Sequence, residues 1–174
     1  MKHNPISTTI IDLDTDKQGW LSLVLIGAIW SDKVFHEKEK DFFVFYLNEV
    51  YENEEDKHHF IELLEREKME VSQLPFPNLS QDFSNIESVE ILDLVLQVLT
   101  IDEVIPKLEQ DFFLYIGKYL RFINHTLLKD LLCLQIESFD KKDFSSFEED
   151  IKMLKKQIAK SRANIPVIQK SVHL

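Results

Sequence analysis

The feature that most constrains the fold is a 12-residue stretch that occurs twice, 70 positions apart. Residues 32–43 read DKVFHEKEKDFF and residues 102–113 read DEVIPKLEQDFF, so Asp, Val, Glu, Asp, Phe and Phe recur at the same spacing. In each copy an apolar run precedes the stretch and an amphipathic run follows it, which predicts a helix, an elbow and a second helix. We therefore expect an internal pseudo-two-fold repeat of this unit, with halves at about residues 17–51 and 86–122.

The composition favours an all-α fold. Only three glycines and five prolines occur in 174 residues, which is poor material for tight β-turns and good material for long helices. Apolar residues recur at helical spacing between capping and breaking residues, which predicts a compact bundle of about seven helices. The predicted helices cover about residues 17–31, 36–51, 54–68, 85–101, 106–122, 125–139 and 144–158.

Three segments are expected along the chain. Residues 1–14 form an N-terminal arm with a short extended piece, residues 15–140 form the helical domain, and residues 141–174 form an amphipathic helix and a tail. A proline-rich break at residues 69–82 separates the two halves of the domain.

The last helix has a narrower apolar stripe than the others. Its apolar residues are separated by three and four positions, as in a heptad seam, and they are Phe144, Phe147, Ile151, Leu154 and Ile158. The seam predicts docking on the bundle, with pairing between two chains as the alternative. The tail from Ser161 to Leu174 loses this periodicity, and we expect it to be partly disordered.

Charge and hydropathy exclude some classes of protein. The net charge is −11, and residues 1–140 carry 12 basic and 27 acidic residues. An acidic body repels nucleic acid and can attract cations or basic proteins. The longest apolar run, Trp20 to Trp30, is too short to cross a bilayer, and no basic leader precedes it. The single cysteine, Cys133, lies in an apolar run, which predicts a core position and a reducing, cytoplasmic setting.

The repeated unit, with Asp at the elbow and Glu seven positions later, resembles the TerB-like fold of tellurite-resistance proteins. The elbow Asp is matched by Asp32 and Asp102, and the helix Glu by Glu39 and Glu109. The resemblance covers about residues 17–140. One departure is that the glycine that follows the Asp in the family is replaced in both copies, by Lys33 and Glu103.

The resemblance implies a non-enzymatic cytoplasmic protein that acts in a stress or tellurite response or as an interaction module. It also implies that acidic residues bind a metal ion. One alternative is a structural or adaptor protein without a metal site, which self-associates as a homodimer or docks a protein partner through the last helix. A carboxylate-dependent hydrolase or metalloenzyme is a third and weaker hypothesis, since no phosphate loop, nucleophile elbow or zinc spacing occurs.

Four carboxylates are the candidate metal ligands: Asp32, Glu39, Asp102 and Glu109. Hard cations such as Ca²⁺ or Mg²⁺ take oxygen ligands, and carboxylates that flank an elbow can converge on one ion. The structural alternative is that the aspartates brace the elbows and the glutamates meet the positive ends of helix dipoles. Weaker candidates lie two positions further on, at Asp41 and Asp111.

Two histidine positions are not predicted to bind a metal ion. His36 is predicted to have a capping or surface role, because the second copy has Pro106 at its position. The stretch from Glu55 to His58 has the Glu-x-x-His spacing of di-iron bundles, but those proteins need the motif on two helices. We therefore expect a solvated helix face there.

Overall fold

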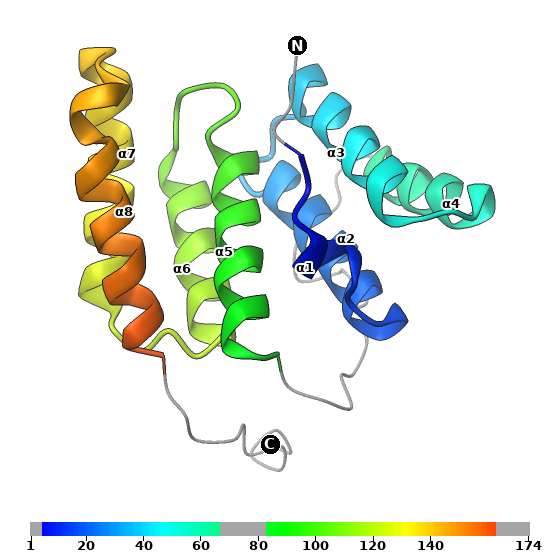
Figure 1. Cartoon of the computed structure of the whole chain (residues 1–174). Helices are drawn as coiled ribbons and strands as arrows, with labels where there is room; N and C mark the ends of the chain where they lie inside the picture. The colour runs from blue at the N-terminus through cyan, green and yellow to red at the C-terminus, as the bar shows by residue number, and fades with distance from the viewer. Residues whose placement is uncertain (1–4, 67–82, 163–174) are drawn as a thin grey trace, which may run out of the picture.

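The computed structural model describes residues 5–66 and 83–162, and within these ranges it contains eight α-helices and no β-strand (Figure 1). The predicted all-α class and the compact helical bundle are confirmed. The predicted break at residues 69–82 lies outside the described residues, as does most of the tail. The helices are α1 (Thr8–Ile11), α2 (Thr15–Trp30), α3 (Glu37–Val50), α4 (Glu54–Leu64), α5 (Asn85–Leu99), α6 (Lys107–Tyr119), α7 (His125–Lys141) and α8 (Phe144–Lys160).

Side-chain caps explain where several of these helices begin. Asp14 accepts a hydrogen bond from the Lys17 N–H at 2.9 Å at the start of α2. Ser84 and Glu87 form a reciprocal capping box at the start of α5. The seven predicted helices start within two residues of their predicted positions, and α2, α4, α5 and α7 have a side-chain cap at that point.

Helices α2 and α5 form the centre of the bundle. Every residue of α2 from Trp20 to Ile29 is buried, and most of α5 is buried as well. A helix that is apolar nearly all round has to lie inside its domain. Helices α3 and α4 contact α2, and α6 contacts α5. Helix α7 packs on α6, and α8 packs on α7. Figure 1 shows α7 and α8 on one side of the central pair and α3 and α4 on the other.

The last helix packs within the chain, as the heptad seam predicted. Ile158 of α8 is buried in the same core as α2 and α5. The Arg162 guanidinium donates hydrogen bonds of 2.8 Å to the carbonyl oxygens of Leu120 and Phe83. Lys155 also forms an ion pair of 2.5 Å with Asp93 of α5. Helix α8 is therefore tied to both α5 and the end of α6.

Three details differ from the predictions. Residues 8–11 are helical because Ser7 caps them and Ile10 is buried. Cys133 is exposed, since a helix turns by about 100° per residue and Cys133 lies on the side of α7 opposite its buried leucines. Helix α4 ends at Leu64, four residues earlier than predicted.

Two further observations concern packing and hydropathy. A Cβ added at Gly117 would lie 2.7 Å from Leu128 Cδ1, so this glycine allows α6 and α7 to approach closely. No helix in the described ranges is long and apolar enough to cross a membrane.

Candidate metal centre

Each elbow begins with an aspartate that folds back on its own backbone. Oδ1 of Asp32 accepts a hydrogen bond from the Val34 N–H at 2.9 Å, and Oδ1 of Asp102 accepts one from the Val104 N–H at 3.3 Å. Such turns hold a short loop in one conformation. The predicted bracing role of both aspartates is confirmed, and it uses one oxygen of each carboxylate.

The residue after each aspartate has a left-handed backbone. Lys33 has a φ of 65° and Glu103 has a φ of 61°. Glycine reaches this region without strain, whereas a residue with a Cβ is disfavoured there by about 1–2 kcal/mol. The two elbows therefore share a backbone conformation at the position where the TerB-like pattern has glycine. The pseudo-two-fold relation of the complete hairpins stays a prediction.

Two glutamates lie in the first turns of the helices that follow the elbows. Glu39 of α3 is 1% exposed and Glu109 of α6 is 0% exposed. Oε2 of Glu39 and both oxygens of Glu109 accept no hydrogen bond from the described part of the chain. Glu39 is partly satisfied, because a hydrogen bond with the His36 backbone favours its charged form. Pro106 stands at the corresponding position before α6 and has no N–H to donate, so Glu109 lacks this bond.

Burial changes the acidity of both glutamates. The pKa of Glu39 is raised from its ordinary value of 4.5 to about 8, and the pKa of Glu109 is raised to about 9. Loss of hydration is the largest cause, the negative charges of Asp32 and Asp102 also contribute to both shifts, and Glu39 contributes to the shift at Glu109. Because a buried carboxylate without a counter-charge is costly, both glutamates are held neutral at pH 7 unless a positive charge reaches them.

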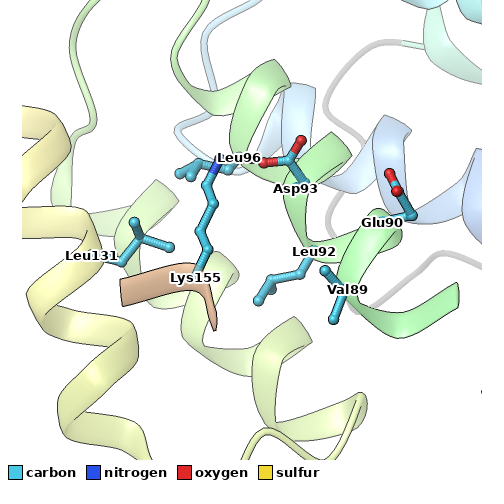
Figure 2. Close-up of a pocket in the computed structure, with 7 residues that line it drawn as sticks. All are labelled: Val89, Glu90, Leu92, Asp93, Leu96, Leu131 and Lys155. Atoms are coloured by element: carbon cyan, nitrogen blue, oxygen red, sulfur yellow. Dashed lines mark hydrogen bonds and ion pairs between the residues drawn. The ribbon is translucent and has the colours of Figure 1, made fainter. Parts of the chain in front are cut away.

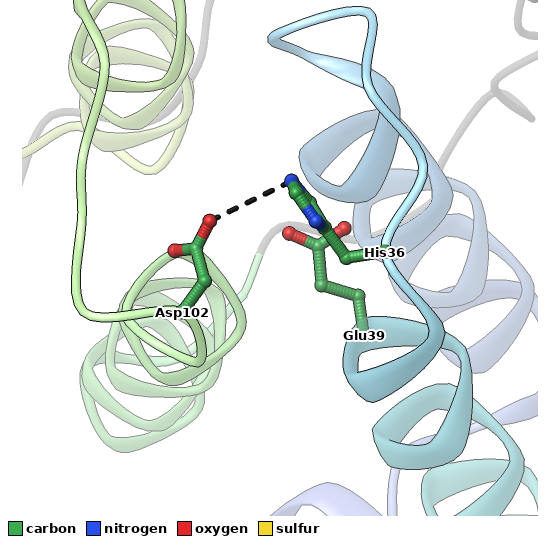
Figure 3. A group of neighbouring side chains, drawn as sticks. All are labelled: His36, Glu39 and Asp102. Carbon is green, nitrogen blue, oxygen red and sulfur yellow. Dashed lines mark ion pairs between the residues drawn. The ribbon is translucent and has the colours of Figure 1, made fainter.

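Figure 3 shows that Glu39 and Asp102 come together at the elbows, with the His36 side chain between the two chain segments. Nε2 of His36 lies 3.6 Å from Oδ2 of Asp102 and 4.0 Å from Oδ2 of Asp32. In Figure 3 the Glu39 carboxylate lies beside the His36 ring on the side of Asp102, and one ligand atom from each of these three residues lies within 4.8 Å of the others. Glu109 lies close enough for its pKa to respond to the other three carboxylates. The structure therefore brings Glu39 and Asp102 together with His36, while Asp32 lies at the edge of this group and Glu109 is linked to it by charge effects alone.

This arrangement has the donors of a cation site and lacks a built-in counter-charge. Among the ion pairs of the described residues, none joins these carboxylates to a lysine or arginine, and His36 is their one basic neighbour. Capping explains part of the bonding of the two aspartates and of Glu39. It leaves Glu109 unexplained, because neither of its buried oxygens is hydrogen-bonded within the described residues.

Sequence reasoning missed one member of the cluster and proposed two residues that lie outside it. His36 was expected to cap α3 or lie on the surface, yet its side chain makes no capping hydrogen bond and reaches Asp102 in the other elbow. Asp41 and Asp111 are both exposed, and Asp111 forms an ion pair with Lys107. The only local signal for His36 is its spacing from Asp32 and Glu39, since the contact with the other elbow is tertiary.

Two other surface regions carry no comparable chemistry. On α4, His58 pairs with Glu62 at 3.0 Å and both side chains are mostly exposed, which agrees with the predicted solvated face. Between α5, α7 and α8 lies a groove of about 200 Å³ (Figure 2). Two of its charged side chains, Lys155 and Asp93, pair with each other. The groove is lined by Val89, Glu90, Leu92, Asp93, Leu96, Leu131 and Lys155.

Comparison with known proteins found no match for this chain. No protein-family model, curated protein or solved structure matches this chain. Its assignment to a family and to an activity therefore has to be argued from its own residues.

Proposed function

We propose that this protein is a non-enzymatic, TerB-like protein that binds a divalent cation between its two elbows. The ligands are Asp32 and Glu39 from the first elbow and Asp102 and Glu109 from the second. Ca²⁺ and Mg²⁺ are the reference ions for such an all-oxygen set, in which water completes the coordination shell. Involvement in a stress or tellurite response is the biological setting that the TerB-like resemblance suggests.

The observation that carries this proposal is the state of Glu109. It is 0% exposed, both of its oxygens lack a hydrogen-bond partner among the described residues, and three other carboxylates raise its pKa. Buried polar groups are satisfied in the great majority of proteins, so an unsatisfied carboxylate needs an explanation. A divalent cation supplies one, because it neutralises the charge and occupies the lone pairs of several of these oxygens at once.

The position of the ligands suggests what the cation does. Two ligands belong to the α2–α3 elbow and two belong to the α5–α6 elbow, so a shared ion would cross-link the halves of the bundle. Binding to the folded state alone raises the free energy of unfolding by about 2.7 kcal/mol at a ligand concentration of 100 times Kd. We infer that the ion stabilises the folded domain and thereby makes its stability depend on cation concentration.

Calorimetric titration of the metal-free protein with Ca²⁺ and with Mg²⁺ tests this proposal, together with thermal unfolding in the presence of each ion. Wild-type protein should bind one ion and unfold at a higher temperature, whereas Glu109→Gln should lose both responses because the amide carries no charge. The matched control is Asp111→Asn, which removes a carboxylate from the exposed face of the same helix.

The decisive outcome is the response of the wild-type protein to divalent cations as a class. If wild-type protein shows neither heat nor a thermal shift with millimolar Ca²⁺, Mg²⁺, Mn²⁺ or Zn²⁺, the site does not bind divalent cations. If Asp111→Asn weakens binding as much as Glu109→Gln does, the ion binds to the general acidic surface rather than between the elbows.

A further inference from the structure

The site proposed above contains one possible ligand that is not an oxygen. His36 precedes α3 and its backbone is extended, with φ of −114° and ψ of 134°. This conformation directs the imidazole away from its own helix, where it makes no capping hydrogen bond, and toward the second elbow (Figure 3). Because Asp32 and Asp102 use Oδ1 for their own backbones, the atoms that face His36 Nε2 are the two Oδ2 atoms.

The distance between His36 and Asp102 is longer than a hydrogen bond and close to the separation of two ligands on one ion. The 3.6 Å between His36 Nε2 and Asp102 Oδ2 is longer than an ordinary N–H···O hydrogen bond of about 2.7–3.2 Å. Two donors at about 2.1 Å from one ion lie about 3.0–3.5 Å apart when they are adjacent in its coordination shell. Small inward movements of His36, Glu39 and Asp102 would therefore bring all three donors onto one ion.

The two elbows are not equivalent in this respect. Pro106 occupies the position in the second elbow that His36 occupies in the first, and a proline ring offers no ligand atom. The proposed ligand set therefore has one nitrogen donor and four carboxylates, of which Glu39 and Asp102 have ligand atoms grouped with that of His36. Imidazole nitrogen favours Zn²⁺, Fe²⁺ and similar ions, carboxylates also suit Mn²⁺, and Ca²⁺ takes oxygen ligands.

We propose that His36 is a direct ligand of the bound cation and that the site selects a first-row transition-metal ion, of the Mn²⁺ to Zn²⁺ class, over Ca²⁺. This inference rests on the proposed function, because Asp32, Glu39, Asp102 and Glu109 supply the remaining ligands. Two of these, Glu39 and Glu109, are at least 99% buried and have oxygens without a hydrogen-bond partner among the described residues. The selectivity comes from His36 alone, so it can be removed without removing the site.

The test compares His36→Gln with wild type in titrations with Zn²⁺, Mn²⁺ and Ca²⁺. Glutamine replaces the nitrogen donor with an amide of similar reach and leaves the four carboxylates in place. Loss of even an outer-shell partner of a metal ligand costs about 10–100-fold in affinity. We therefore expect Zn²⁺ and Mn²⁺ affinity to fall by at least about 10-fold in His36→Gln, while Ca²⁺ affinity stays at the wild-type value.

A matched control is needed because α4 carries exposed histidines beside acids. His58→Gln removes an exposed imidazole that pairs with Glu62 on α4, and it should leave the affinity for all three ions unchanged. A second readout is the NMR spectrum of the histidine rings. Zn²⁺ should shift the Nε2 resonance of His36 in the wild type and leave that of His58 in place.

The outcomes separate this inference from the proposed function. If His36→Gln binds Zn²⁺ as tightly as wild type while Glu109→Gln does not bind it, the cation site stands and the role of His36 is wrong. Equal wild-type affinities for Zn²⁺ and Ca²⁺, or loss of Zn²⁺ binding in His58→Gln, would also overturn the inference. If wild type binds none of these ions, both proposals fail together.

Discussion

The buried glutamates predict that the metal-free protein loses stability as the pH rises toward neutrality. Glu109 has a folded-state pKa of about 9 and an unfolded value near 4.5, so between these values the folded chain holds one proton that the unfolded chain has released. Stability falls with increasing pH wherever the folded state binds more protons than the unfolded state. Glu109→Gln removes this ionisation, and we expect the metal-free variant to be more stable than wild type at pH 7.

The magnitude follows from the linkage between protonation and folding. One extra proton in the folded state changes the free energy of unfolding by about 1.4 kcal/mol per pH unit. From pH 4.5 to pH 7 the wild type should therefore lose about 3 kcal/mol through Glu109, and that loss should be absent in Glu109→Gln. At pH 7 and below, Glu109 stays protonated in the folded state, so the size of this loss is set by the pH interval and by the unfolded-state pKa.

Urea unfolding in EDTA, followed by circular dichroism at half-unit steps from pH 4.5 to pH 8, measures this difference. The two proteins should be equally stable near pH 4.5 and should diverge by about 3 kcal/mol at pH 7, with Asp111→Asn following the wild type. A stability difference that stays constant over this interval would refute the reasoning, because it would mean that Glu109 ionises in the folded state as it does in the unfolded state. A saturating divalent cation should abolish the wild-type loss and have no effect on Glu109→Gln.

Three further predictions follow from the elbows, a cap and the site. Lys33→Gly and Glu103→Gly should each stabilise the protein by about 0.5–1 kcal/mol, because glycine adopts a positive φ without strain, although it also loses more entropy on folding. Urea unfolding checks this, and the two shifts in midpoint should add in the double variant. Ser84→Ala should destabilise it by about 1 kcal/mol through loss of the capping box, measured by thermal unfolding, and an unchanged midpoint would contradict the role of the cap. Cation binding at pH 7 should release protons, because the two buried glutamates must ionise to bind the ion. Calorimetry in buffers of different ionisation enthalpy measures this release. A binding heat that is the same in every buffer would contradict it.

Helix content could be predicted from the sequence because its signals are local. Ser84 caps α5 from within the same turn, and the apolar periodicity of α2 shows that the helix has to be buried. The errors occur where three-dimensional neighbours decide the outcome. Residues 8–11 form a helix whose one buried side chain, Ile10, packs against the core, and Cys133 is exposed because the buried face of α7 is set by the helices beside it.

The sequence indicated the carboxylates of the candidate site, but it did not indicate their surroundings or the histidine beside them. The repeat alone indicated Asp32, Glu39, Asp102 and Glu109, since matching acids at matching elbows suggest a common role. It could not show that Glu109 lacks a hydrogen-bond partner among the described residues, because that depends on what surrounds the side chain. It also could not place His36 beside Asp102, because that contact joins two hairpins.

The amino-acid sequence by itself determined which segments become helices, where the elbows lie and which acids flank them, because periodicity, caps and the lack of glycine act over a few residues. Tertiary structure alone decided that the elbows meet, that two glutamates lose their water, and that an imidazole enters their cluster. Hydration and charge act through space, so these properties exist only once segments distant in sequence have packed together.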